Sequence, residues 1–131
     1  MKLFHSRIRL ALLLMGLLAA AFLVARAIAG PSIRRAHTGF LFQQLGQFYG
    51  RAVTSGEERA QSSQELIDRI PQWPIDWNSC DFRDGTVYDG WGTPVEIGVD
   101  TSGIHLRSAG MDRLLNTSDD LSFNIANSSG A

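Results

Sequence analysis

Residues 95–125 read VEIGVDTSGIHLRSAGMDRLLNTSDDLSFNI, and three short segments of this stretch alternate apolar and polar side chains. Alternation with a period of two is typical of β-strands that have one buried face. The segments are 95–99, 104–107 and 121–125, and turn residues join the first two as a hairpin. We therefore predict a small three-stranded antiparallel sheet whose apolar face must be covered by another element.

The predicted cover is an amphipathic helix over residues 30–53, in which apolar residues recur at the spacing of one helix face. We expect a break at Gly30 and Pro31, where this helix would start, and an end at residues 54–56. Ser62 and Glu65 form a capping-box pattern for a short second helix, and residues 71–94 are expected to be irregular. The predicted fold class is α+β, with a long apolar and amphipathic N-terminal helix packed on the sheet. The predicted core is Phe40, Leu41, Leu45, Phe48 and Leu66 against Val95, Ile97, Ile104, Leu106, Phe123 and Ile125.

Residues 1–29 form a basic and apolar segment with two possible roles. As a signal anchor, a helix over residues 8–28 is about 31 Å long, close to the thickness of the hydrocarbon core. As a cleaved signal peptide, the segment has a small-x-small site before Gly30. Either role places residues 31–131 across the membrane, because a short basic tail stays inside. The anchored form is a single-pass inner-membrane protein with its C-terminal domain, including the globular part at 54–131, on the periplasmic side.

Composition excludes several classes of protein. A length of 131 residues leaves room for one small domain beside the apolar segment. The single cysteine, Cys80, excludes an intrachain disulfide framework and a Cys-rich zinc site. The basic N-terminal half is too short and too apolar for a nucleic-acid surface. No catalytic motif is recognisable, and we expect no catalytic residue and no enzyme.

The loop between the second and third predicted strands carries three carboxylates, Asp112, Asp119 and Asp120. Carboxylates about 5 Å apart repel each other by roughly 1–3 kcal/mol, so a bound cation would ease closure of the loop. Nearby hydroxyl, amide and carbonyl oxygens can complete the shell that Ca²⁺ prefers, and the lack of His and Cys disfavours zinc. From composition alone, a solvated acidic loop remains the alternative.

Two motifs in order resemble the C-terminal half of the major pseudopilin of type II secretion systems, general secretion pathway protein G. The first is the box D-x-W-G-x-P at residues 89–94. The second is S-x-G-x-D followed by two adjacent aspartates, and it consists of Ser108, Gly110, Asp112, Asp119 and Asp120. The resemblance covers residues 85–125 well, and the order of helix, irregular stretch and small sheet also matches.

The resemblance implies a membrane-anchored structural subunit that binds one calcium ion and has no catalytic role. Its implied partners are other pseudopilin or secretion-system subunits, or further copies of the chain. The implied metal ligands are the side chains of Asp112, Asp119 and Asp120, with backbone carbonyls near Ala109, Thr117 and Ser122.

The box at residues 89–94 is expected to be structural. We expect Asp89 to accept N–H bonds within its own turn and Trp91 to cover the edge of the sheet. Gly92 would supply an unusual backbone angle, and Pro94 would start the following strand.

The N-terminus departs from the family, whose members have a Gly-Phe cleavage point before the apolar helix and a Glu five residues into it. This sequence has no acidic residue before Glu57, and its only Gly-Phe pair, Gly39-Phe40, follows the apolar run. The difference argues against prepilin processing. A second hypothesis is therefore a small exported binding module, released by cleavage after Ala29, that uses the Trp-rich stretch at 71–94 as its partner surface.

Overall fold

The structure is a computed structural model that describes the backbone of residues 2–126 and the side chains of residues 11–126. Two compact units make up the chain, Met1–Ile33 and Arg34–Ala131. The helix α1, Lys2–Thr54, contributes to both units. The predicted break at Gly30 and Pro31 was wrong, because α1 continues through both residues. A proline inside a helix removes one backbone hydrogen bond, and here that loss does not end the helix.

The first unit exposes apolar side chains around the whole helix. Each of the following is more than half exposed: Leu12, Leu13, Leu14, Met15, Leu17, Leu18, Phe22, Leu23, Val24, Ile28 and Ile33. None of the most apolar 18-residue window is buried within the protein. Among the described residues, this one helix is long and apolar enough to cross a membrane.

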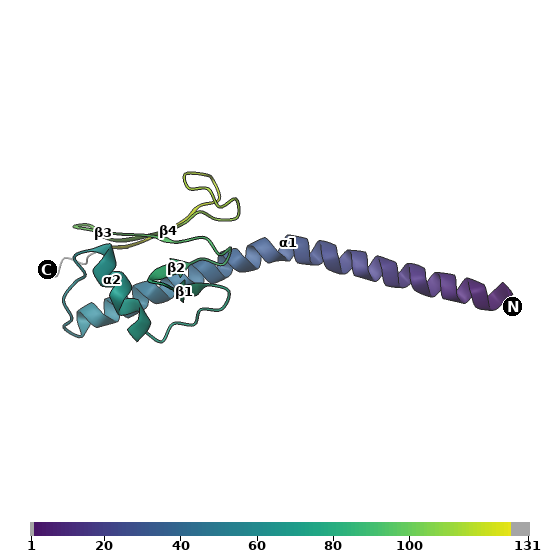
Figure 1. Ribbon diagram of the computed structural model, residues 1–131, viewed down its shortest axis with the longest axis horizontal. Helices are drawn as coiled ribbons and strands as arrows, with labels where there is room; N and C mark the ends of the chain where they lie inside the picture. The colour runs from purple at the N-terminus through teal and green to yellow at the C-terminus, as the bar shows by residue number, and fades with distance from the viewer. Residues whose placement is uncertain (1, 127–131) are drawn as a thin grey trace. The chain divides into compact units, whose positions relative to one another are not determined.

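The second unit contains the predicted antiparallel sheet, formed by β3 (Glu96–Asp100), β4 (Gly103–Ser108) and β5 (Leu121–Ala126). Ile97, Leu106 and Phe123 lie opposite one another across the three strands, so they share one face. β3 and β4 run alongside the last turns of α1 (Figure 1), against which the apolar face of the sheet packs. The strand assignments and the α+β class are thereby confirmed.

The buried face of α1 differs from the predicted one. Phe40 is 46% exposed, whereas Phe42, two residues further on, is 2% exposed. The residues of α1 that are buried are Thr38, Leu41, Phe42, Leu45, Tyr49 and Ala52. The predicted core position of Phe40 was wrong because the face turned inward includes Thr38, a polar residue that an apolar pattern does not select. Phe48 is half-buried and stacks on Trp73, with ring centroids 6.2 Å apart.

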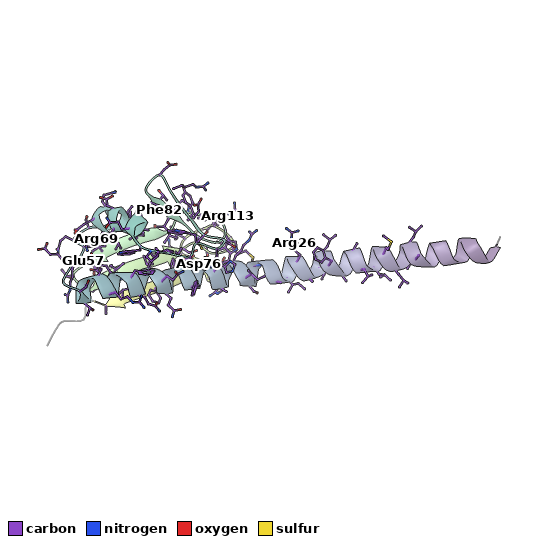
Figure 2. The ribbon with its side chains drawn as sticks, turned by 90° about the horizontal axis from the view of Figure 1, so that it is seen from below. Arg26, Glu57, Arg69, Asp76, Phe82 and Arg113 are labelled. Carbon is purple, nitrogen blue, oxygen red and sulfur yellow. The ribbon has the colours of Figure 1, made fainter. Side chains whose placement is uncertain are left out.

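The short helix α2, Ser63–Arg69, begins where the capping box predicts. The Ser62 side chain accepts the N–H of Glu65, and the 3₁₀ turn Ile70–Gln72 follows. Arg69 ties α2 to the segment after α1, because its guanidinium donates to the Glu58 carbonyl at 2.6 Å and lies 3.8 Å from Glu57. Figure 2 shows the Arg69 and Glu57 side chains next to each other.

A second hairpin joins β1 (Asp81–Arg83) to β2 (Thr86–Tyr88), so the prediction that residues 71–94 are irregular was wrong there. Each strand has only three residues, too few for alternation to be recognised. Asp84 and Gly85 form the turn with φ of 51° and 70°. Positive φ at both central residues is typical of a tight hairpin turn, and Asp-Gly is its strongest sequence signal. That dipeptide could have revealed the hairpin.

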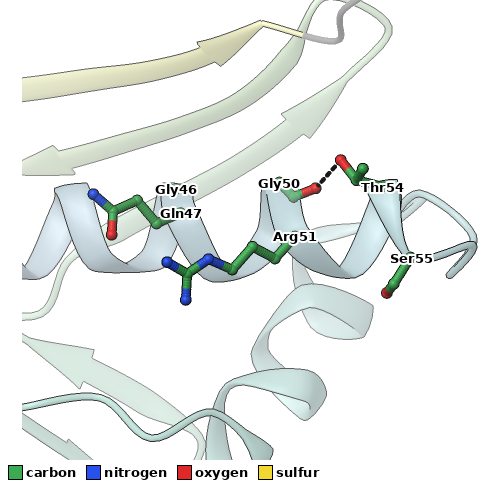
Figure 3. Close-up of a pocket in the computed structure, with 6 residues that line it drawn as sticks. All are labelled: Gly46, Gln47, Gly50, Arg51, Thr54 and Ser55. Carbon is green, nitrogen blue, oxygen red and sulfur yellow. Dashed lines mark hydrogen bonds between the residues drawn. The ribbon is translucent and has the colours of Figure 1, made fainter.

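The contact between α1 and β5 leaves little room for a side chain at position 46. A Cβ at Gly46 would lie 3.1 Å from Cε1 of Phe123, whereas a Cβ at Gly50 would meet nothing within 4 Å. Both glycines line an open groove of about 540 Å³ on α1 (Figure 3). Replacing each glycine by alanine changes helix propensity in the same way, but only the change at position 46 affects packing against Phe123. Comparing the two variants therefore separates helix propensity from packing.

We predict that Gly50→Ala raises the free energy of unfolding by about 0.5–1 kcal/mol, because alanine loses less backbone entropy in a helix. Gly46→Ala should gain less than this or lose stability, because Phe123 must move. Urea unfolding of the two variants measures the difference. An equal gain from both substitutions would show that β5 does not pack against Gly46.

Candidate functional site

The box at residues 89–94 is organised around the buried carboxylate of Asp89, which is 1% exposed. Its Oδ1 accepts the backbone N–H groups of Trp91 at 2.9 Å and Thr93 at 2.8 Å. Gly92 has φ of 74°, and its N–H donates to the Asp89 carbonyl. Pro94 then pairs with Tyr88 in an isolated β-bridge. The box is thus a closed turn built on one side chain.

The same carboxylate joins the box to the acidic loop. Asp89 Oδ2 accepts the hydroxyl of Ser108 at 2.5 Å, and the Ser108 oxygen accepts the N–H of Gly110 at 3.2 Å. Ser108 is fully buried at the end of β4. No salt bridge reaches Asp89 within residues 11–126. Hydrogen bonds from both sequence motifs therefore compensate the burial of this carboxylate.

The box is also joined to α1 through Thr38 and Gly90. The N–H of Gly90 donates to the Thr38 hydroxyl at 3.0 Å, and that hydroxyl donates to the Arg34 carbonyl. A Cβ at Gly90 would lie 2.7 Å from the Arg34 carbonyl oxygen, so any other residue would force the backbone apart. The helix, the box and the loop consequently share one buried polar cluster.

Cys80 lies beside this cluster as a buried free thiol. Burial raises the pKa of its thiol to about 11, and the Asp89 carboxylate adds to the increase despite a hydrogen bond with Thr38. The thiol is therefore protonated at neutral pH and is a poor nucleophile.

The acidic loop of residues 109–120 folds back on itself through its own side chains. Asp112 Oδ1 accepts the N–H of Leu114 at 2.8 Å, and Asp119 Oδ2 accepts the N–H of Asp112 at 3.0 Å. The Thr117 hydroxyl lies 2.7 Å from Asp119 Oδ1 and 3.3 Å from Asp120 Oδ1. Thr117 therefore brings the two adjacent carboxylates of the second motif to one hydroxyl.

Hydrogen bonding keeps these carboxylates ionised. The Thr117 hydroxyl, followed by the Asp112 N–H, lowers the pKa of Asp119 to about 2. Desolvation raises the pKa of Asp120, but the Asn116 N–H and the Arg107 guanidinium outweigh it, so the net shift is downward. Both groups carry a negative charge at neutral pH, which is the state that a cation requires.

The residues suit a hard cation in their donor chemistry. Gly110 has φ of 67°, and a Cβ there would lie 2.7 Å from Asp119 Oδ2, so only glycine leaves this space open. The other predicted metal ligands are backbone carbonyl oxygens near Ala109, Thr117 and Ser122, and Ala109 is buried. However, no three Asp, Glu, His or Cys side chains are gathered as a metal-holding group within the described part of the chain. A calcium shell at this loop would rely on backbone carbonyls beside the carboxylates.

Sequence reasoning missed a cluster at the hairpin between β3 and β4. His105 Nε2 lies 3.0 Å from Asp100 Oδ2 and 3.1 Å from the Ser102 hydroxyl oxygen. The hydroxyl donates instead to Asp100 Oδ1, at 2.6 Å. Because Asp100 accepts that hydrogen, the imidazole does not activate Ser102 as a nucleophile.

The same contacts affect the charge of His105. Its Nδ1 lies 3.0 Å from Asn124 Oδ1, and hydrogen bonds with Asn124 and Asp100 raise the pKa of the imidazole. His105 projects outward from the sheet, as its alternation with buried Ile104 and Leu106 predicts. We therefore interpret the cluster as a structural hydrogen-bond network that links β3, β4 and β5 on their outer face.

Comparisons with protein-family models, with curated proteins and with solved structures give no match. Function must therefore be inferred from the residues and their geometry.

We predict that Asp89→Ala lowers the free energy of unfolding by about 3 kcal/mol or more, because it leaves buried donors without an acceptor. Urea unfolding of the full chain in detergent measures the change. The control is Asp68→Ala, an exposed aspartate of α2, which should change stability by no more than about 0.5 kcal/mol. Similar losses from the two substitutions would contradict a central role for Asp89.

Proposed function

We propose that the chain is a membrane-anchored, non-catalytic structural subunit of pseudopilin type that binds calcium in its acidic loop. The first unit supports the anchor, because its apolar side chains are exposed on every side of the helix. In the proposed orientation the basic N-terminus lies in the cytoplasm, and residues 34–131 lie in the periplasm. The apolar segment remains attached and crosses the inner membrane once.

The pseudopilin part of the proposal is carried by the hydrogen bond from Ser108 to Asp89. The D-x-W-G-x-P box and the S-x-G-x-D segment are separate in sequence, yet their first residues form one buried contact. Two motifs that occur together by chance have no reason to share their central polar group. This contact supports treating both motifs as one structural unit, as the resemblance implies.

Proposed partners are copies of this chain or other pseudopilin and secretion-system subunits in the same membrane. A structural role agrees with the state of the reactive side chains. Cys80 is buried and protonated, and Ser102 donates to Asp100 rather than to His105.

Calcium would supply positive charge to the loop and hold its two ends together. Asp112 and Asp119 contribute carboxylates, and the backbone carbonyls of Ala109, Thr117 and Ser122 are the further proposed ligands. Asp120, the third carboxylate predicted as a ligand, is instead paired with Arg107. A ligand present at 100 times its dissociation constant stabilises the folded state by about 2.7 kcal/mol. That is a large fraction of the stability of a small domain.

We predict that calcium raises the thermal midpoint of the full chain in detergent by about 10 °C relative to EGTA, when present at 100 times its dissociation constant. Asp119→Asn should remove most of this difference, because it neutralises a proposed ligand. Asp68→Asn, the same change on the exposed face of α2, should leave the difference intact. A wild-type midpoint that is the same in calcium and EGTA would contradict the calcium proposal.

We predict that deletion of residues 2–28 releases the protein from membranes, because it removes the apolar segment. Sedimentation after carbonate extraction measures this release. Protease added to spheroplasts should digest residues 34–131 of the full chain if they lie in the periplasm. Retention of the truncated chain in the membrane pellet would contradict the anchor.

The second hypothesis, an exported binding module, makes the opposite prediction about the mature chain. The intact mass of the exported protein distinguishes the two, because cleavage after Ala29 removes the anchor. The aromatic stretch favours the structural hypothesis. Trp91 is buried, and Trp73 and Trp77 are half-buried and stack on Phe48 and Phe82.

A further inference from the structure

Arg107 makes the most extensive charged contact in the acidic loop. Its Nε and Nη2 lie 2.9 Å and 2.6 Å from Asp120 Oδ2, and Nη2 also donates to Asn116 Oδ1 at 2.9 Å. The backbone N–H of Asn116 donates to the same Asp120 oxygen at 2.9 Å. The Asp120 side chain is only 9% exposed. One arginine on β4 therefore holds both Asn116 and Asp120.

Arg107 has another acidic residue nearby and does not pair with it. Glu96 lies directly opposite Arg107 across the β3–β4 ladder, where opposite charges commonly attract. No salt bridge joins these two described side chains, and the guanidinium is directed to Asp120. The loop residue Asp120, rather than Glu96 on β3, thus determines the position of the Arg107 guanidinium.

We propose that Arg107 is the resident cation of the acidic loop, holding Asp120 and Asn116 in the closed arrangement when no metal is bound. A guanidinium with two N–H groups on one carboxylate restricts the position of that carboxylate as well as neutralising it. The half of the loop next to β5 therefore keeps its fold in calcium-poor conditions. Arg107 acts here as a positioning residue, since it is not a proposed ligand.

The division of charge in the loop follows from this role. With Asp120 neutralised by Arg107, the negative charges of Asp112 and Asp119 remain, and no salt bridge reaches either within residues 11–126. Their combined charge equals that of one calcium ion in magnitude. The assignment of calcium to these two carboxylates rests on the proposed function, whereas the arginine contact does not.

The test compares Arg107→Gln with Arg113→Gln in the full chain in detergent. Arg113 is an exposed arginine of the same loop that forms no salt bridge in the described part of the chain, so the second substitution makes the same change in charge. In EGTA, Arg107→Gln should lower the thermal midpoint by about 4 °C or more and speed hydrogen exchange at the Asn116 amide. Arg113→Gln should do neither.

Two further measurements identify why Arg107→Gln lowers the thermal midpoint: the double variant with Asp120→Asn, and the addition of calcium. Adding Asp120→Asn to Arg107→Gln should recover part of the midpoint, because it removes the partly buried charge left without a partner. Calcium should raise the midpoint of Arg107→Gln more than that of wild type, since the ion then also replaces the missing guanidinium.

The outcomes separate this proposal from the proposed function. Equal midpoints and equal exchange for Arg107→Gln and Arg113→Gln in EGTA would overturn the role of Arg107. A lower midpoint for Arg107→Gln, with no effect of calcium on any variant, would support Arg107 and contradict calcium binding. A calcium effect that is smaller in Arg107→Gln than in wild type would overturn the view that the ion can replace the arginine.

Discussion

The buried carboxylate of Asp89 is the constraint on which the second unit depends. A buried carboxylate is costly unless its oxygens accept hydrogen bonds or pair with a cation. Here the donors are two N–H groups of the box and the hydroxyl of Ser108, which belong to different elements. Asp89 is satisfied only when β4 and the box are both in place. These elements should therefore fold and unfold together.

The hydrogen bond between Ser108 and Asp89 also determines the conformation at the start of the acidic loop. Ser108 donates to Asp89 and accepts from Gly110, which fixes the first turn beyond β4. Gly110 then lies so close to Asp119 that a side chain there would collide with it. Beyond that point the order of the loop depends on its own charges and on Arg107. The loop thus combines a start fixed by the core with an end held by ion pairing.

Local sequence patterns correctly predicted the elements that depend on residues close in sequence. They failed where contacts between residues far apart in sequence determine the structure. The three strands follow from alternation, and α2 follows from Ser62 and Glu65. The inward face of α1 was misplaced at Phe40 because Thr38 is held inward by the box, a contact over 52 residues. The pairing of Arg107 with Asp120 depends on the path of the loop between β4 and β5, which the sequence pattern does not contain.

The two units place opposite demands on their surroundings. The first unit exposes mostly apolar side chains over many turns of helix, and exposed apolar area costs about 25 cal/mol per Å². The second unit contains the buried apolar core and carries all thirteen acidic residues of the chain, of which Asp89 alone is buried. In the proposed function a bilayer meets both demands, because its hydrocarbon core would surround the first unit and the aqueous phase would surround the second. In the proposed function, the acidic loop would then lie in the compartment whose ions determine its charge balance.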